Sequence, residues 1–231
     1  MKYALVNNSK THAKDVTSGT IGNDIWFPEY EVKSCVGKYR QYWVYTNGSP
    51  NLPEGYEPES EWHSSWKTSL IHEFTEVVCG ENREHRADIL TKEYAIEIQK
   101  SRICGFAVDE RINFYKHLTD RRVIWIVNVF EPWKNDRIKT SISKDGKKNQ
   151  FDITWSRGWK WVIDIAKTTN THLFLDVGSK GNNILKVWTF EGKLKGSWFK
   201  KVDFFDEFLK EYSLPEFQQN PESFVDNLKN I

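Results

Sequence analysis

Two acidic residues on neighbouring predicted strands are the groups in this chain best placed to do chemistry. The segment 94–99, YAIEIQ, alternates in character, so it predicts a strand in which Glu97 and Gln99 share one face. Asp88 lies in the preceding predicted strand, and a hairpin would bring it beside Glu97. A carboxylate in an apolar strand is costly to desolvate unless it has a partner, such as a divalent cation. Asp88 and Glu97 therefore predict a site for Mg²⁺ or Mn²⁺, which favour oxygen ligands.

An ion at this position would polarise a phosphate oxygen and activate water for in-line attack. The residues alone leave a second interpretation open, in which the two carboxylates pair with Arg86 or Arg102 on a solvated sheet face. Other catalytic motifs are missing from the sequence. The segment HEFTE approximates HExxH but ends in Glu76, and neither GxGxxG nor GxxxxGK[ST] occurs. The sequence therefore argues against zincin, dinucleotide-binding and P-loop sites.

The elements that must position these residues predict a mixed α/β fold. Apolar residues recur at every fourth position from Trp62 to Phe74, which indicates a helix. The next predicted elements, in chain order, are two strands around the turn 80–82, the strand 94–99, a helix over 106–118 and an apolar strand buried on both faces at 121–130. The candidate core residues of this helix are Phe106, Ile112, Phe114 and Leu118. Beyond them we expect a helix at 159–167, a strand at 172–177, a hairpin around 184–190 and a helix at 203–212.

Charge is distributed unevenly, although 33 basic and 32 acidic residues give a net charge of only +1. The segments 133–150 and 180–201 carry local net charges of +4 and +5, whereas 203–231 carries −5. The two basic segments could follow a phosphate backbone, with the acidic end balancing them. They could equally be solvated loops.

Composition narrows the class of protein further. Hydrophobic residues make up 39% and charged residues 28%, which favours a folded core over disorder. Cys35, Cys79 and Cys104 form no CxxC pair, which argues against a disulfide scaffold and a zinc ribbon. No apolar run approaches the roughly 20 residues of a membrane span, and the N-terminus lacks the apolar segment of a signal peptide. We therefore expect a soluble cytoplasmic protein with no membrane partner.

Four short motifs extend the pattern around Asp88 and Glu97. They are ESxxHxxxK from Glu59 to Lys67, RADI at 86–89, IEIQxS at 96–101 and ERxxxY at 110–115. Together they resemble the CoiA-like competence nuclease family, a branch of the PD-(D/E)XK nuclease superfamily, over about 75 residues of the chain. The resemblance implies a restriction-endonuclease-like core of helix, three-strand meander, helix and strand, with a β extension before it and α/β additions after it.

The resemblance assigns roles to the residues of the two central motifs. Asp88 and Glu97 correspond to the metal-binding carboxylates of the family. Gln99 stands where most of the superfamily has a catalytic lysine. A glutamine cannot supply a positive charge, but it can orient the attacking water or a phosphate oxygen. Lys100 faces away from Glu97 by strand alternation, so we do not expect it to replace that lysine.

The resemblance also assigns roles to two helices. Glu59, His63 and Lys67 are spaced i, i+4, i+8 and form one polar stripe. The family places this stripe against the metal site, where Lys67 would stabilise the charge of the transition state and His63 would bind phosphate or carry a proton. Glu59 is expected at the substrate side, and a solvated helix face is the alternative for all three.

Arg111 and Tyr115, also i, i+4, could contact the nucleic-acid backbone or cap the acidic site as a structural salt bridge. The chain departs from the family at its N-terminus. Family members commonly carry a CxxC…H metal-binding element there, whereas this chain has Cys35 alone. A structural zinc ion is therefore not expected.

These observations divide the chain into a β-rich N-terminal extension at 1–55, a PD-(D/E)XK nuclease-like domain at 56–200 and an acidic helical tail at 201–231. We expect a divalent-metal-dependent deoxyribonuclease, an endonuclease rather than an exonuclease. The sequence leaves RNA open as a substrate, and it leaves a homodimer open. Two alternatives are a nuclease-fold protein that binds nucleic acid without cleaving it, and a protein-interaction module that uses some of the 11 tryptophans.

Overall fold

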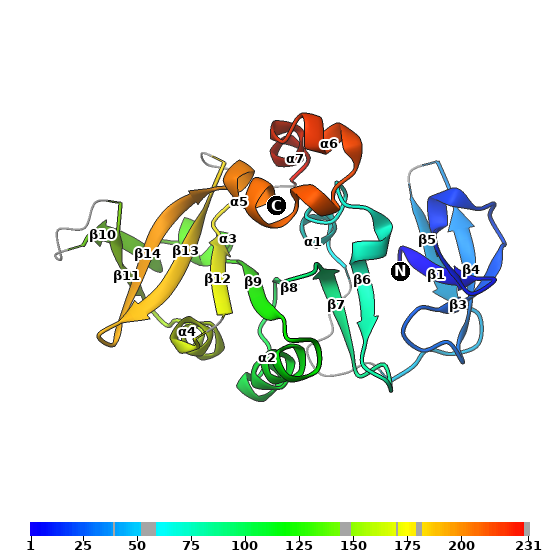
Figure 1. Ribbon diagram of the computed structural model, residues 1–231, viewed down its shortest axis with the longest axis horizontal. Coiled ribbons are helices and arrows are strands. Elements are labelled where there is room, and N and C mark those ends of the chain that lie inside the picture. The colour runs from blue at the N-terminus through cyan, green and yellow to red at the C-terminus, as the bar shows by residue number, and fades with distance from the viewer. Residues whose placement is uncertain (39, 52–58, 144–148, 170, 179–181, 229–231) are drawn as a thin grey trace.

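The computed structural model describes residues 1–38, 40–51, 59–143, 149–169, 171–178 and 182–228. Within them the chain forms a five-stranded and a nine-stranded sheet with several helices, so the predicted mixed α/β class is confirmed (Figure 1). Among the described residues, no helix combines the length and the apolar character that crossing a membrane would require.

The smaller sheet is formed by the N-terminal segment, where short strands were predicted. Its order is β2-β1-β3-β4-β5, and all its pairs are antiparallel. It has a small core of its own around Val32 and Trp43. The strands are β1 (Tyr3–Val6), β2 (Ser9–His12), β3 (Ile21–Asp24), β4 (Glu31–Val36) and β5 (Gln41–Tyr45), with a 3-10 helix η1 (Ala13–Asp15) after β2.

The larger sheet has the order β10-β11-β14-β13-β12-β9-β8-β7-β6. Its centre, β8-β9-β12, is parallel, and the strands on both sides of that centre are antiparallel. The strands are β6 (Thr75–Cys79), β7 (His85–Leu90), β8 (Tyr94–Gln99), β9 (Arg122–Asn128), β10 (Ile138–Ile142), β11 (Phe151–Trp155), β12 (Thr171–Asp176), β13 (Asn183–Phe190) and β14 (Lys193–Lys200).

Helices cover both faces of the larger sheet (Figure 1). One face carries α2 (Gly105–Thr119) and α4 (Lys160–Lys167). The other carries α1 (Glu61–Ser65), α5 (Lys201–Phe208), α6 (Pro215–Gln219) and α7 (Glu222–Asn227). The remaining helices are α3 (Phe130–Lys134), η2 (His72–Phe74) and η3 (Lys210–Tyr212).

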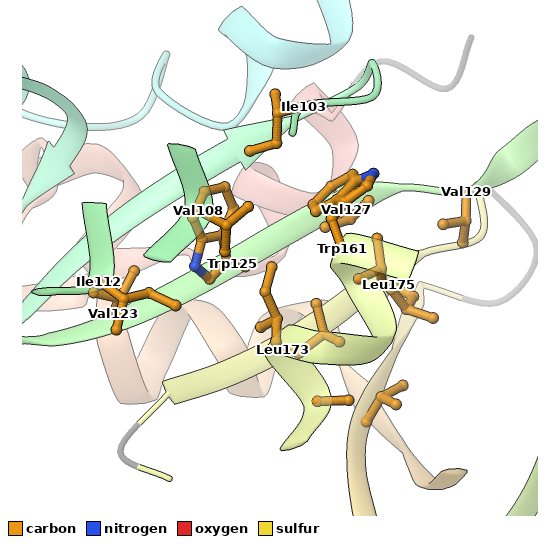
Figure 2. Packing of buried hydrophobic residues seen from close by; sticks show 14 of the residues in the cluster. Ile103, Val108, Ile112, Val123, Trp125, Val127, Val129, Trp161, Leu173 and Leu175 are labelled. Carbon is orange, nitrogen blue, oxygen red and sulfur yellow. The ribbon is translucent and has the colours of Figure 1, made fainter. Parts of the chain in front are cut away.

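The apolar strand β9 connects the three layers, because its side chains pack against the helices on both faces of the sheet. Val123, Trp125 and Val127 point into the cluster under α2 and α4, where Trp161 packs edge-on against Trp125 (Figure 2). The alternate residues of β9 enter the cluster on the opposite face. The prediction of a strand buried on both faces is therefore confirmed, as expected for a central parallel strand.

The predicted helix from Trp62 to Phe74 is wrong in its length. Ser60 caps α1 by accepting a hydrogen bond from the His63 amide at 3.1 Å, but the helix ends at Ser65. The chain continues through turns, because serine and threonine are weak helix formers and four of the residues from 64 to 69 are of these types. Trp62, Trp66 and Leu70 still enter one core cluster, as their spacing predicted.

Two predictions about individual surfaces also need correction. Phe106 is 77% exposed in the first turn of α2, so it is not a core residue. The basic segments expose fewer charges than expected, because Lys195 and Lys201 are buried and paired with Asp152 and Asp176. Lysines that the structure does place in solvent are Lys134, Lys139, Lys193 and Lys200. Lys144, Lys147, Lys148 and Lys180 lie outside the described residues.

The C-terminal helices share a core with the large sheet. Trp66 packs edge-on against Phe204 of α5 and Phe224 of α7. Beside them, Lys201 Nζ lies 3.0 Å from Asp176 Oδ1, and each side chain is only 3% exposed. Asp176 Oδ2 also accepts a hydrogen bond from the Trp62 indole at 2.9 Å. One buried carboxylate thus ties α1 and α5 to the end of β12.

Replacing Asp176 by asparagine should destabilise the protein strongly, because Lys201 would stay buried without its counter-charge. The expected loss is about 3–5 kcal/mol in the free energy of unfolding, measured by urea denaturation. Asp164→Asn is the matched control, because its lysine pairs lie on the surface of α4 and should contribute less than about 1 kcal/mol. Equal losses in the two variants would contradict the account.

Candidate functional site

The candidate site lies where the three antiparallel strands β6, β7 and β8 depart from regular geometry. Thr75 pairs with Ile89 and Val77 pairs with Ala87, so Glu76 faces Asp88 between these pairs. Glu76 has a φ of 49°, in the left-handed region. A residue with a side chain seldom adopts this conformation inside a strand, and such strain is common at functional sites.

Asp88 marks the point where β7 and β8 separate. Regular pairing between these strands ends at Ile89. At the residue before Ile89, the side chain replaces the backbone pairing: Asp88 Oδ2 accepts a hydrogen bond from the Ile98 amide at 2.8 Å. Ala87 packs under α2, whereas Ile89 packs on the opposite face of the sheet, although residues two apart normally share a face. The strand therefore changes face at Asp88, whose side chain bonds to the backbone of β8.

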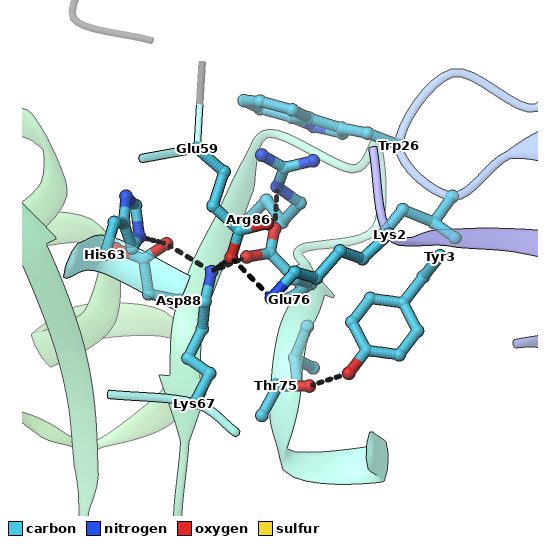
Figure 3. A network of polar contacts seen from close by, with 12 residues as sticks. Lys2, Tyr3, Trp26, Glu59, His63, Lys67, Thr75, Glu76, Arg86 and Asp88 are labelled. Atoms are coloured by element: carbon cyan, nitrogen blue, oxygen red, sulfur yellow. Dashed lines mark hydrogen bonds and ion pairs between the residues drawn. The ribbon is translucent and has the colours of Figure 1, made fainter. Parts of the chain in front are cut away.

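The polar residues around α1 converge on Asp88 (Figure 3). His63 Nε2 lies 2.7 Å from Asp88 Oδ1, and Lys67 Nζ lies 3.7 Å from the same atom. Lys67 also donates to Glu76 Oε1 and lies 2.9 Å from Glu59 Oε1. Glu59 and Lys67 flank α1 in the chain and do not belong to it. The three residues nevertheless face the acidic strands, as the motif predicted.

Glu76 is also held from the side of the N-terminal sheet. Arg86 Nε lies 3.0 Å from Glu76 Oε2, and the Arg86 guanidinium lies over the ring of Trp26. Lys10 of β2 donates to the carbonyl oxygens of His72, at 2.8 Å, and of Thr75. The N-terminal sheet therefore supports both the side chain of Glu76 and the backbone that leads to it.

Ion pairing keeps the side chains of Asp88, Glu76 and Lys67 charged although they are largely buried. Burial acts to raise the pKa of Asp88, but the charges of His63 and Lys67 and the bonds from His63 and Ile98 hold it well below its usual range. Burial likewise acts to raise the pKa of Glu76, and Arg86 and Lys67 reverse the effect. Burial acts to lower the pKa of Lys67, and the surrounding carboxylates raise it above its usual value. The cluster thus holds carboxylates and cations in balance.

Among the described residues, Glu97 is bonded to two residues of α2 and not to the polar residues around α1. Arg111 Nη1 donates to Glu97 Oε2 at 2.7 Å, and the Tyr115 hydroxyl donates to Oε1 at 2.9 Å. Burial raises the pKa of Glu97 to about 7; Arg111 opposes the shift and the charge of Asp88 adds to it. Tyr115 is fully buried and bonded to Glu97, so of the two alternatives left open for it, the structural cap is the arrangement found. Arg111 is 16% exposed and combines that cap with access to solvent.

Asp88 and Glu97, the predicted metal-binding residues, therefore do not form a two-carboxylate site with each other. Within the described part of the chain, one group of potential donors has ligand atoms within 4.8 Å of one another: His63, Glu76 and Asp88. An imidazole nitrogen and two carboxylate oxygens suit Mn²⁺ or another transition ion. Glu97 does not belong to this group and is bonded to α2 instead.

The remaining predicted residues have clear positions. Glu97 and Gln99 are both buried, whereas Ile96 and Ile98 enter the cluster on the other face, as strand alternation predicted. Gln99 donates to the Ser101 carbonyl at 3.2 Å. Lys100, directly after β8, is exposed.

The sequence motifs missed Glu76. A usable signal was available, because Glu76 is a lone acid in the apolar strand TEVVC, the same feature that singled out Glu97. Its position opposite Asp88 also follows from the hairpin register. The left-handed turn of its backbone and its contacts with the N-terminal sheet have no local signature.

Comparison of the chain with protein-family models, curated proteins and solved structures finds no match. The resemblance to CoiA-like nucleases stays a prediction that rests on its four short motifs. The chemistry of the site is therefore argued from the contacts of Asp88, Glu97 and their neighbours.

The raised pKa of Glu97 predicts a pH-dependent contribution to stability. Between pH 4.5 and about 7 the folded state keeps a proton on Glu97 that the unfolded chain releases. This contribution is complete below pH 4.5 and is lost as the pH rises through 7. In EDTA, the stability of the wild type relative to Glu97→Gln should therefore fall as the pH rises across this interval.

Urea denaturation at several pH values measures this difference. Glu93→Gln removes an exposed glutamate from the turn before β8 and should show a smaller pH-dependent change. A difference between wild type and Glu97→Gln that is constant from pH 4.5 to 7 would contradict the assignment.

Proposed function

We propose that this protein is a divalent-metal-dependent nuclease that hydrolyses phosphodiester bonds of DNA, with its active site at Asp88. The observation that carries the proposal is the break between β7 and β8, in which the Asp88 carboxylate bonds to the strand that bears Glu97. The surrounding order supports it: α1, the meander β6-β7-β8, α2, and β9 parallel to β8. This order agrees with the one that the resemblance to CoiA-like nucleases implies for the core.

A metal ion would be held by Asp88 with Glu76 and His63 as neighbouring donors. Once bound, it would polarise a phosphate oxygen and lower the pKa of a coordinated water. Glu97 is kept in place by hydrogen bonds from Arg111 and Tyr115 of α2. The contacts with Arg111 and Tyr115 hold the Glu97 carboxylate in place against repulsion by the charge of Asp88.

Substrate can approach the site from the side of its partly exposed groups. The side chains of His63, Asp88 and Arg111 are 11%, 13% and 16% exposed. A partly exposed imidazole and guanidinium are suited to bind phosphate oxygens, and arginine can do so through two parallel bonds. The fully enclosed Tyr115 contributes only to the support of Glu97.

A second candidate, binding of nucleic acid without cleavage, is favoured by two observations. Gln99, which stands where the resemblance places a catalytic lysine, donates to the Ser101 carbonyl. Glu97 already has two donors within hydrogen-bond distance. The tryptophan-rich interaction module has less support, because six of the 11 tryptophans are buried in the cores.

Cleavage assays separate the first two candidates. The protein should nick or degrade plasmid or single-stranded DNA with Mg²⁺ or Mn²⁺, and EDTA should stop the reaction. Asp88→Asn should lower the rate at least about 100-fold, in the range lost with one preorganised electrostatic group. Asp109→Asn, which changes an exposed residue of α2, is the matched control and should cleave like the wild type. DNA binding without any metal-dependent cleavage would overturn the proposal in favour of the second candidate.

The exposed lysines of β10 and β14 should contribute to duplex binding at a distance from Asp88. In the sheet, β14 lies five strand spacings from β7, which is about 24 Å and corresponds to about seven base pairs. The double variant Lys139→Gln/Lys193→Gln should reduce the salt dependence of binding to a 20-base-pair duplex. Each lost phosphate contact should change the slope of log affinity against log salt by about 0.9. An unchanged slope would identify these lysines as solvated surface groups.

A further inference from the structure

The ammonium group of Lys67 lies inside the group of carboxylates that a metal ion would use. It contacts Glu76 Oε1, lies 2.9 Å from Glu59 Oε1 and lies 3.7 Å from Asp88 Oδ1. Figure 3 shows the Lys67 side chain pointing toward these carboxylates. Only 5% of the side chain is exposed. The carboxylates therefore already share a counter-charge that belongs to the chain.

Lys67 and a divalent ion require the same oxygen atoms. The potential donor atoms of His63, Glu76 and Asp88 lie within 4.8 Å of one another, and Lys67 contacts two of these three residues. Two cations at such short separation repel each other strongly in a buried site. Metal binding therefore requires the Lys67 ammonium to withdraw from Glu76 and Asp88.

Glu59 offers Lys67 a position to which it can withdraw. It pairs with the ammonium, yet it is not one of the three grouped donors. At 22% its side chain is more exposed than those of Glu76 and Asp88, at 10% and 13%. An ammonium held by Glu59 alone would keep a counter-charge and would lie nearer to solvent.

We propose that Lys67 is an internal counter-cation that competes with the divalent metal ion for Glu76 and Asp88, and that metal binding releases its ammonium toward Glu59. The proposal rests on the metal site of the proposed function. It assigns Lys67 two consecutive tasks: it balances the carboxylates before metal binds, and it presents a positive charge to a substrate phosphate afterwards. It also makes Glu76, rather than Glu97, the second carboxylate of the cation site.

Mn²⁺ binding measured by electron paramagnetic resonance of the free ion tests the competition directly. Lys67→Met should bind Mn²⁺ about tenfold more tightly or better, because the competing charge is gone. Glu76→Gln should bind Mn²⁺ about tenfold more weakly, since a donor is lost. Lys100→Met and Glu73→Gln remove an exposed charge of each sign and should stay within about twofold of the wild type.

A measurement on the wild type covers the case in which Lys67→Met does not fold. Saturating Mn²⁺ should raise the rate at which an amine-reactive reagent labels Lys67, followed by mass spectrometry of the peptides. Labelling of Lys100 serves as the internal reference, because that side chain is exposed. Labelling of Lys67 that stays constant or falls with Mn²⁺ would overturn the proposal.

The binding data contain further outcomes that would overturn it. A folded Lys67→Met protein with unchanged or weaker Mn²⁺ affinity would show that Lys67 does not compete. Loss of Mn²⁺ binding in Glu97→Gln but not in Glu76→Gln would place the ion between Asp88 and Glu97. Both readouts are independent of DNA, so absence of cleavage would refute the proposed function alone, and normal cleavage with unchanged affinities would refute the competition alone.

Discussion

Buried carboxylates need counter-charges, and the centre of this protein is arranged around that requirement. Glu76, Asp88 and Glu97 lie on three adjacent strands; Glu76 and Glu97 are buried, and the Asp88 side chain is 13% exposed. Their partners come from different parts of the chain, since Lys67 follows α1 and Arg111 belongs to α2. Removing one partner of a buried ion pair costs far more than the pair contributes, so these contacts fix α1 and α2 against the sheet.

The same requirement explains why the N-terminal sheet is attached to the strand that bears Glu76. The left-handed backbone of Glu76 leaves carbonyl groups at the start of β6 that Lys10 reaches from β2. Thr75 also donates its hydroxyl to the Tyr3 hydroxyl, at 3.4 Å. An irregular strand segment is thus stabilised by a neighbouring sheet with a separate core. The N-terminal segment therefore takes part in positioning the candidate site.

The parts of the fold that could be predicted from the sequence are those encoded by local pattern. Alternation placed the strand 94–99 at its observed bounds, and an apolar run identified β9. The length of the helix that begins near Trp62 was overestimated. The apolar spacing continues beyond Ser65 through turns, whose residues Trp66 and Leu70 still pack in the core. The role of Glu76 depends on strand register, a left-handed residue and a distant sheet. None of these is visible in a window of neighbouring residues.

The central claim is that Asp88, Glu76 and His63 form a cation site that Lys67 occupies until a divalent ion replaces it. Anomalous diffraction from crystals soaked in Mn²⁺ tests it most directly, because it locates the ion and the ammonium in the same map. The account predicts an anomalous peak bounded by His63, Glu76 and Asp88, with Lys67 Nζ moved toward Glu59. A peak bounded by Asp88 and Glu97 with Lys67 unmoved, or no peak at a saturating concentration, would contradict it.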